Sequence, residues 1–371
     1  MEYYIVFIFL AIFSLMEVYG LKEKQKKYLL CLGFLLVWGL QALRWETGTD
    51  WGSYSYFFET AGTRSFFTNS EFEWGYTLLN YIVYQINNSY TAFLIIFCGL
   101  WVFLIYKFAE TFTPCYSLVL LFFFSATIFP IRFSLATAII YISYNAIIRK
   151  EFGKFLICIL IATLIHRTAI VFLPVYFVAR RKYPAYFLII FYIIAFIVGA
   201  DTDSIFNTAL KYAALIFSDV GDTLQNKMTF YLNEEVPERS QLSSFRVLLS
   251  FLNSSIFIIL FYFFRYRRFR DSNEYNTILN LYMFGLIFNR IFWLSIPDFA
   301  RITVYFQGAF IFLIIKILSL YRKNTQMILA LLLILYCFSK LIENLFGYYS
   351  TLFLPYISIF SEMKRVVYDG I

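Results

Sequence analysis

Apolar stretches of about 18 or more residues recur along this chain from end to end, and this feature constrains its fold more than any other. Each stretch is long enough to cross the hydrocarbon core of a bilayer, roughly 30 Å thick, as one helix. Of the 371 residues, 61% are hydrophobic and 15% are charged, whereas an average soluble protein has about 25% charged residues. The sequence therefore predicts a polytopic helical membrane protein and excludes a water-soluble fold.

The formal net charge of +8 is spread over short basic clusters that separate the apolar runs. Such a distribution is typical of membrane topology, so we expect no nucleic-acid partner. The five cysteines stand singly in or beside hydrophobic segments, which predicts neither disulfides nor a metal site. The first residues lack a basic stretch and a cleavage site, so we expect 3–20 to be a retained first span.

Basic clusters in short loops stay on the cytoplasmic side, and five such clusters orient the chain. They are Lys22/Lys24/Lys26/Lys27, Arg149/Lys150/Lys154, Arg180/Arg181/Lys182, Arg265/Arg267/Arg268/Arg270 and Arg322/Lys323. Because an even number of crossings must separate neighbouring clusters, we expect an all-α polytopic bundle of about eleven crossings plus re-entrant or interfacial helices. The predicted spans are 3–20, 28–43, 90–107, 115–129, 131–148, 184–199, 245–264, 275–296, 302–320 and 326–345.

Two weaker apolar segments complete this prediction. Because the crossings between two basic clusters must be even in number, 74–86 should not cross, and we expect it to be a short re-entrant or surface helix on the outer side. The limbs 155–165 and 168–179 are each shorter than a normal span, and they form a re-entrant hairpin or two short helices that meet at His166.

The whole chain, 1–371, is expected to be a single integral membrane domain. Two outer loops carry most of its hydrophilic residues. The loop 44–89 combines charges with aromatic rings, and the loop 201–243 is the longest hydrophilic stretch. The aromatic residues of the first loop suit either carbohydrate rings or the headgroup region, and the sequence favours neither use.

Five arginines lie near the outer ends of apolar segments, against the trend that places basic residues inside. They are Arg44, Arg132, Arg167, Arg290 and Arg301. A guanidinium at membrane depth is costly unless it pairs with an acid or serves a ligand, and its planar fork suits phosphate. Ordinary ion pairs, such as Arg44 with Glu46 or Asp50 and Arg301 with Asp298, are the alternative. The set as a whole predicts an outward-facing pocket for an anionic, phosphorylated substrate.

His166 is the only histidine in the chain, and it lies beside Arg167 at a turn between apolar limbs. A single histidine is more often structural than catalytic, yet an imidazole titrates near neutral pH and can accept a proton. The acids Asp50, Glu73 and Asp298 are candidates to neutralise the arginines, to accept sugar hydroxyls or to act as a base. One histidine without a carboxylate at ligand spacing does not predict a metal.

Ordered motifs in this sequence resemble the signature of the EpsG family of bacterial exopolysaccharide polymerases. They are Arg44 with Gly48-Thr49-Asp50 and Tyr54, Glu73-Trp74-Gly75-Tyr76, Arg132-Phe133-Ser134-Leu135-Ala136, His166-Arg167-Thr168-Ala169, and Arg301 with Tyr305-Phe306. The resemblance runs to about Phe306. Arg290 and Asp298 come from topology alone, and 201–243 and the C-terminal tail match no family pattern.

The resemblance implies Wzy-type polymerisation, in which undecaprenyl-pyrophosphate-linked oligosaccharide repeat units are joined into O-antigen or exopolysaccharide. The implied enzyme is a GT-C-like, metal-independent membrane glycosyltransferase without a cofactor. It would be a multi-pass protein of the bacterial inner membrane with its active site facing the periplasm. Both the donor and the acceptor would be lipid-linked glycans, and a chain-length regulator is an implied partner.

The site residues follow from combining the arginines with this implied reaction. We expect Arg132, Arg290 and Arg301 to stabilise the departing pyrophosphate. Arg44 and Asp50 would shape the sugar site, and His166 would be the base, with Asp50 or Glu73 as substitutes. The remaining substrate-binding candidates are Arg167, Asp298 and Tyr305.

Three other functions use similar residues. A lipid-linked oligosaccharide flippase or exporter would hold pyrophosphate without transferring the glycan, but the inner halves of the predicted spans are almost wholly apolar, which disfavours a path across the membrane. An O-acyltransferase would keep His166 as its base but needs an acyl donor. An O-antigen ligase differs from a polymerase only in its acceptor.

Overall fold

The computed structural model describes residues 1–63, 66, 67, 70, 72–112, 115–200, 244–292, 301–347 and 350–361. Every named element among these residues is a helix, and one isolated antiparallel bridge joins Arg44 to Ser358. The predicted loop 201–243 and the candidate Asp298 lie outside the described residues. The chain forms two compact units, Met1–Leu173 with Ile314–Ile371 (unit 1) and Pro174–Leu313 (unit 2), and each is considered by itself.

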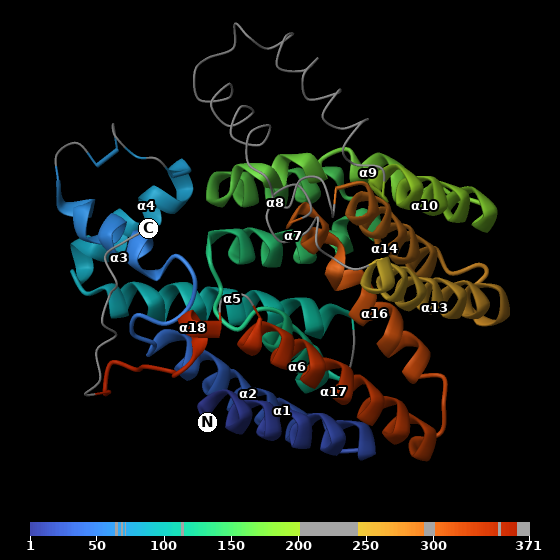
Figure 1. Ribbon diagram of the computed structural model, residues 1–371, viewed down its shortest axis with the longest axis horizontal. Coiled ribbons are helices and arrows are strands. Elements are labelled where there is room, and N and C mark those ends of the chain that lie inside the picture. Colours follow the sequence, from blue (N-terminus) through green and yellow to red (C-terminus); the bar gives the residue numbers. More distant parts are fainter. Residues whose placement is uncertain are drawn as a thin grey trace, which may run out of the picture. The chain divides into compact units, whose positions relative to one another are not determined.

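Unit 1 contains the N-terminal helices together with α17 from the C-terminal part of the chain (Figure 1). Its elements are α1 (Glu2–Tyr19), α2 (Glu23–Ala42), α3 (Trp51–Glu59), η1 (Thr60–Gly62), α4 (Trp74–Ile86), α5 (Tyr90–Phe112), α6 (Tyr116–Ala126), α7 (Arg132–Arg149), α8 (Phe152–Ile165), η2 (Arg167–Phe172), α17 (Lys323–Phe346) and α18 (Ser350–Phe353). Helices α1, α6 and α17 pack together, α2 packs on α5, and α7 packs along α8.

Unit 2 is built around helix α14, which packs against α10, α13 and η3. Its elements are α9 (Val175–Val178), α10 (Ala185–Ala200), α13 (Ser244–Arg268), α14 (Asn273–Phe292), η3 (Arg301–Phe306) and the larger part of α16 (Gln307–Leu318). A Cβ added at Gly199 of α10 would collide with the backbone carbonyl of Arg290. Only glycine therefore permits this approach of α10 to α14.

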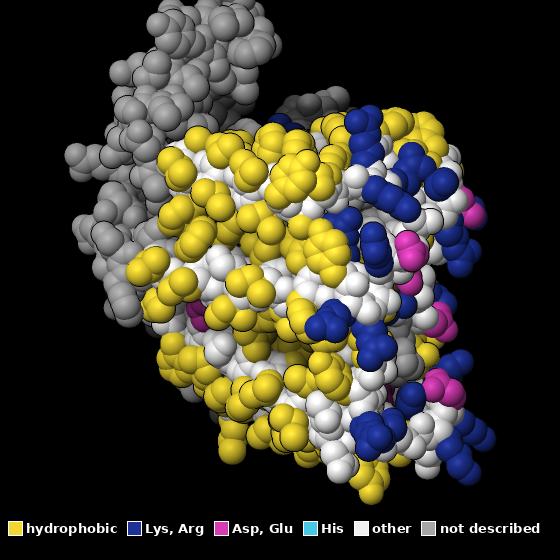
Figure 2. All heavy atoms as spheres, turned by 90° about the vertical axis from the view of Figure 1, so that its right-hand side faces the viewer, with side chains coloured by type: hydrophobic (Ala, Val, Ile, Leu, Met, Phe, Trp, Pro, Cys, Tyr) yellow, Lys and Arg dark blue, Asp and Glu magenta, His cyan; other side chains and the backbone are white. Residues whose placement is uncertain are grey.

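Five helical segments among the described residues are long and apolar enough to cross a membrane. They are Glu2–Tyr19, Tyr90–Phe112, Leu248–Arg268, Arg301–Leu318 and Lys323–Phe346. Helices also form at the other predicted spans, but these are shorter or more polar, so the number of about eleven crossings stays a prediction. On the face drawn in Figure 2, Lys and Arg side chains occupy a different area from a broad field of hydrophobic side chains, as expected of a membrane protein.

The segment 74–86 and the two limbs around His166 form the helices that parity predicts. Helix α4 has 13 residues, which span only about 20 Å and are too few to cross the membrane. Helix α8 ends at His166, whose backbone is extended, with φ −152° and ψ 112°. The chain then continues as the short helix η2. Whether these limbs are re-entrant stays a prediction.

Glu17, near the end of α1, is 2% exposed and binds the first turn of α6. Its two carboxylate oxygens accept hydrogen bonds from Ser117 N at 2.9 Å and Ser117 Oγ at 2.8 Å. A carboxylate at a helix N-terminus satisfies backbone N–H groups that have no partner within the helix. Glu17 therefore fixes α1 to α6.

Candidate functional site

Arg132, the first residue of α7, forms the centre of a charged cluster in unit 1. Its Nη1 donates to Glu73 Oε2 in an ion pair in which the two side chains are 16% and 14% exposed. Its Nε lies 3.4 Å from Tyr54 Oη, and its guanidinium lies 4.0 Å from the ring centre of Phe72. The other N–H bonds of this guanidinium have no partner among the residues described.

Glu73 precedes α4 and connects the start of α7 to the end of α8. Its Oε1 accepts the backbone N–H of Arg167 at 3.0 Å, while its Oε2 accepts from Arg132. Helix α4 can lie this close to α8 because residue 75 is glycine: a Cβ there would be 2.7 Å from Leu164 O. Both oxygens of Glu73 are thus engaged in holding other groups, which favours a positioning role over its predicted use as a substitute base.

His166 lies beside this cluster, at the break between α8 and η2. Its Nδ1 and Thr168 Oγ1 are 2.8 Å apart, and its ring packs edge-to-face against Phe133 with 5.3 Å between the ring centres. Glu73 binds both the Arg132 guanidinium and the backbone N–H of Arg167, so the chain next to His166 lies close to the guanidinium. Arg167 is exposed, and its side chain makes no hydrogen bond or ion pair to the described residues.

Tyr54 and Asp50 border the same cluster from α3. Asp50 is exposed and precedes the helix with a left-handed backbone, φ 59°. Burial raises the pKa of Tyr54, Asp50 and Glu73 raise it further, and the Arg132 guanidinium opposes them. Tyr54 therefore keeps its proton at neutral pH and offers Arg132 a neutral hydroxyl.

Arg44 lies apart from this cluster and is only 2% exposed. Its guanidinium stacks on Phe129 at 4.6 Å from the ring centre, and Trp51, Tyr54 and Tyr90 belong to an aromatic network between the two arginines. The alternative ion pair of Arg44 with Glu46 or Asp50 does not form in the part of the chain that the structure describes.

The remaining candidates belong to unit 2. Arg290 is 4% exposed and donates to α13, through Nη2 to Ser250 O at 2.8 Å and to Ser254 Oγ at 2.7 Å. Arg301 begins η3 and is exposed, whereas Tyr305 of the same helix is fully buried. The structure thus places Arg290 as a bridge between α14 and α13, and its catalytic role stays a prediction.

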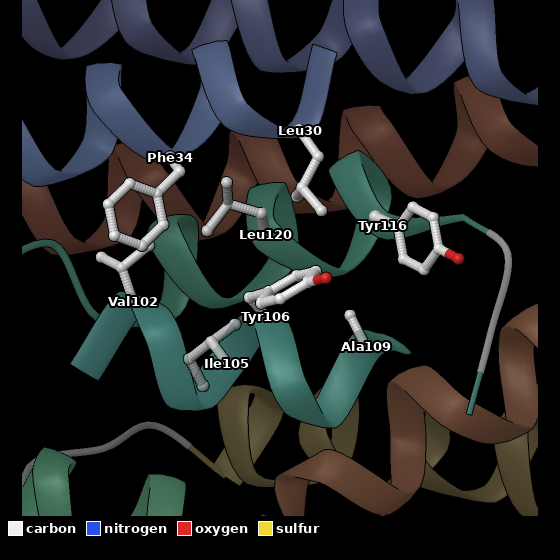
Figure 3. Close-up of a pocket in the computed structure, with 8 residues that line it drawn as sticks. All are labelled: Leu30, Phe34, Val102, Ile105, Tyr106, Ala109, Tyr116 and Leu120. Atoms are coloured by element: carbon white, nitrogen blue, oxygen red, sulfur yellow. The ribbon is translucent and has the colours of Figure 1, made fainter. Parts of the chain in front are cut away.

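A small apolar pocket lies between α2, α5 and α6 (Figure 3). It is lined by Leu30, Phe34, Val102, Ile105, Tyr106, Ala109, Tyr116 and Leu120. Its lining offers no charged side chain. Among the described residues, no group of three His, Cys, Asp or Glu side chains is placed to hold a metal ion.

Sequence reasoning missed Thr168 and the segment 350–361 as parts of this region. Thr168 was visible in the His166-Arg167-Thr168 motif, but only the fold shows its hydroxyl on the imidazole. The segment 350–361 carries no motif, yet it pairs with the 43–48 backbone.

The fold and the cluster define a class: a helical membrane protein with a polar cluster of Arg132, Glu73 and His166 where α4, α7 and α8 meet. The chain belongs to the EpsG family, whose sequence model matches residues 27–358, nearly the whole chain. Neither a curated protein nor a solved structure matches it. Membership makes it a membrane protein of polysaccharide biosynthesis, with the general character of a glycosyltransferase-like polymerase.

Proposed function

We propose that the protein is a Wzy-type polymerase that joins undecaprenyl-pyrophosphate-linked repeat units at the outer face of the bacterial inner membrane, with the cluster around Arg132 as its active site. The family supports the general activity. The observation that carries the specific proposal is the position of Arg132, which Glu73 holds beside His166 while part of its guanidinium has no partner among the described residues.

In the proposed reaction, an acceptor hydroxyl attacks the anomeric carbon of the donor glycan. The new carbon–oxygen bond forms as the bond between that carbon and the pyrophosphate oxygen breaks, and the electron pair of the broken bond leaves with undecaprenyl pyrophosphate. The hydroxyl proton passes to Nε2 of His166, which requires the tautomer in which Nδ1–H donates to Thr168 Oγ1.

Arg132 and Arg167 stabilise the negative charge that develops on the leaving pyrophosphate. Two guanidinium groups supply this charge without a metal, and a planar donor fork matches phosphate oxygens. Asp50 and Tyr54 border the cluster and are placed to accept and donate hydrogen bonds to sugar hydroxyls. Arg290, Arg301 and Tyr305 of unit 2, and Asp298, stay candidates for binding the same substrates.

Complementation of a strain that lacks the gene tests this proposal. The strain would carry wild type, Arg132→Ala, His166→Ala or the charge-matched control Lys154→Gln, all at verified equal expression. Lys154 is a suitable control because it is exposed and lies at the opposite end of α8 from His166. Surface glycan would be resolved on a gel, which separates polymers by the number of repeat units.

We expect Arg132→Ala and His166→Ala to lose the ladder while a single repeat unit still reaches the surface, and Lys154→Gln to keep the ladder. If no unit reaches the surface in either variant, export or ligation is the better assignment. A full ladder in both variants would remove this cluster from the chemistry.

A further inference from the structure

Arg44 is a buried cation with no counter-ion among the described residues. It is 2% exposed, its side chain makes no ion pair or hydrogen bond to the described residues, and its Nε is fully enclosed without an acceptor. Its one close partner is the ring of Phe129. By contrast, the Arg132 guanidinium is paired with Glu73.

This arrangement is unfavourable unless something else supplies negative charge. Arginine stays protonated in proteins, and an enclosed, unpaired charge is among the costliest groups to bury. A cation–π contact offsets only part of that cost. Neither Glu46 nor Asp50 makes an ion pair or hydrogen bond with the guanidinium, and one carboxylate oxygen of Glu46 is itself buried without a partner.

The backbone at Gly48 packs closely against this guanidinium and against Phe129. Gly48 has φ +99°, and a Cβ there would lie 3.1 Å from Arg44 Nη1 and 2.9 Å from Phe129 Cδ2. Any larger residue at position 48 would strain the backbone and crowd the donor atoms of Arg44.

A C-terminal segment, residues 350–361, covers this place, and we name it the strap. Trp45 N donates to Ile357 O at 2.8 Å, Gly48 N donates to Leu352 O at 2.8 Å, and Ile359 N donates to Leu43 O at 2.9 Å. Two strap rings, those of Phe353 and Tyr356, stack on Phe129, the ring that holds Arg44.

We propose that Arg44 is a second anion site, which binds a phosphate group, and that the strap must leave the 43–48 segment for the phosphate to enter. The proposal deepens the proposed function, because a polymerase handles two lipid pyrophosphates, a donor and an acceptor. The Arg132 cluster then holds one of them and Arg44 the other. The phosphate can come from the lipid carrier or from free pyrophosphate.

A disulfide between strap and motif tests the role of the strap. Leu43 and Ile359 are the pair next to the antiparallel bridge of Arg44 with Ser358, and Ile359 N donates to Leu43 O. Cα atoms of a hydrogen-bonded pair lie about 5.5 Å apart, within disulfide range. The double variant Leu43→Cys/Ile359→Cys would be studied as the full chain in lipid nanodiscs, oxidised and reduced, beside Arg44→Gln and the control Lys154→Gln. The probes are inorganic pyrophosphate and undecaprenyl pyrophosphate, with binding measured by calorimetry.

We expect Arg44→Gln to weaken binding of at least one probe roughly tenfold or more, since a charge-assisted hydrogen bond is lost. The oxidised double variant should show the same loss, and reduction should restore binding. Binding of inorganic pyrophosphate at Arg44 would show that the site recognises a free phosphate group without the lipid. Binding of the lipid form alone would assign the site to the carrier.

Wild-type binding of both probes by Arg44→Gln and by the oxidised double variant would overturn the proposal. If Arg44→Gln does not fold, the comparison of the oxidised with the reduced double variant still tests whether the strap controls phosphate binding. Binding does not require polymerisation, so this test stays separate from the complementation test: loss of the Arg132 active site would leave an anion site at Arg44 standing, and the reverse also holds.

Discussion

At the scale of single residues, the candidate site depends on how Glu73 distributes its two oxygens. One holds the Arg132 guanidinium and the other holds the Arg167 backbone. These partners lie 59 and 94 residues away in the sequence. A carboxylate used in this way fixes the direction in which Arg132 and the His166 turn point, and its charge lowers the cost of burying the guanidinium.

Glu73→Gln should reduce polymer formation roughly tenfold or more, because a charge-assisted hydrogen bond contributes about 1.5–3 kcal/mol. Gel analysis of surface glycan in the complemented strain measures this effect. Glu59→Gln is the matched control, since Glu59 is an exposed carboxylate on α3. An unchanged ladder in Glu73→Gln would show that the ion pair does not position Arg132.

Thr168→Val should lower the turnover rate roughly three- to tenfold with little change in apparent KM, because it removes the hydrogen bond that sets the His166 tautomer. Thr168→Ser should recover the rate, since it keeps the hydroxyl. Kinetics with lipid-linked repeat units and purified protein provide the measurement. Equal rates for Thr168→Val and Thr168→Ser would contradict the positioning role.

At the scale of elements, the site exists because α4 lies against the end of α8. Gly75 makes that approach possible, since a Cβ there would meet Leu164 O at 2.7 Å and Leu164 Cβ at 2.8 Å. The same contact places Glu73, at the start of α4, within hydrogen-bond distance of Arg167 N. The Glu73-Trp74-Gly75-Tyr76 motif therefore combines the carboxylate that binds Arg132 with the glycine that positions it.

Gly75→Ala should destabilise unit 1 by about 1–3 kcal/mol, as overpacking does, and should abolish polymer formation by moving Glu73 off Arg167. Gly153→Ala, on α8, is the matched control: a Cβ there meets nothing within 4 Å, and alanine in a helix is about 1 kcal/mol more favourable than glycine. Thermal unfolding and surface-glycan gels would compare the two variants. Wild-type behaviour of Gly75→Ala would show that α4 can shift without consequence.

At the scale of the whole molecule, the basic clusters predict that the loop carrying α3 faces outward and that the start of α8 faces the cytoplasm. Ser53→Cys and Lys154→Cys report these two sides, because both positions are exposed. In intact cells a membrane-impermeant maleimide should label Ser53→Cys, and it should label Lys154→Cys only after permeabilisation. Wild type, which has the exposed Cys31, gives the background labelling. The opposite labelling pattern would show that the predicted orientation is wrong.

The sequence by itself determined the class of fold and most helix positions, because apolar runs of membrane length can satisfy their backbone only as helices. It also predicted a turn at His166, where the structure ends a helix, and a pocket formed by the arginines near the expected outer ends of the apolar segments. Only the tertiary structure decided which charges meet. Glu73 binds Arg132 and the backbone N–H of Arg167 across long stretches of chain, Arg44 has no acid partner among the described residues, and 350–361 pairs with 43–48. The physical reason is that the hydrophobicity of a segment is a local property of the sequence. Ion pairing depends on side chains from distant segments, which only helix packing brings together.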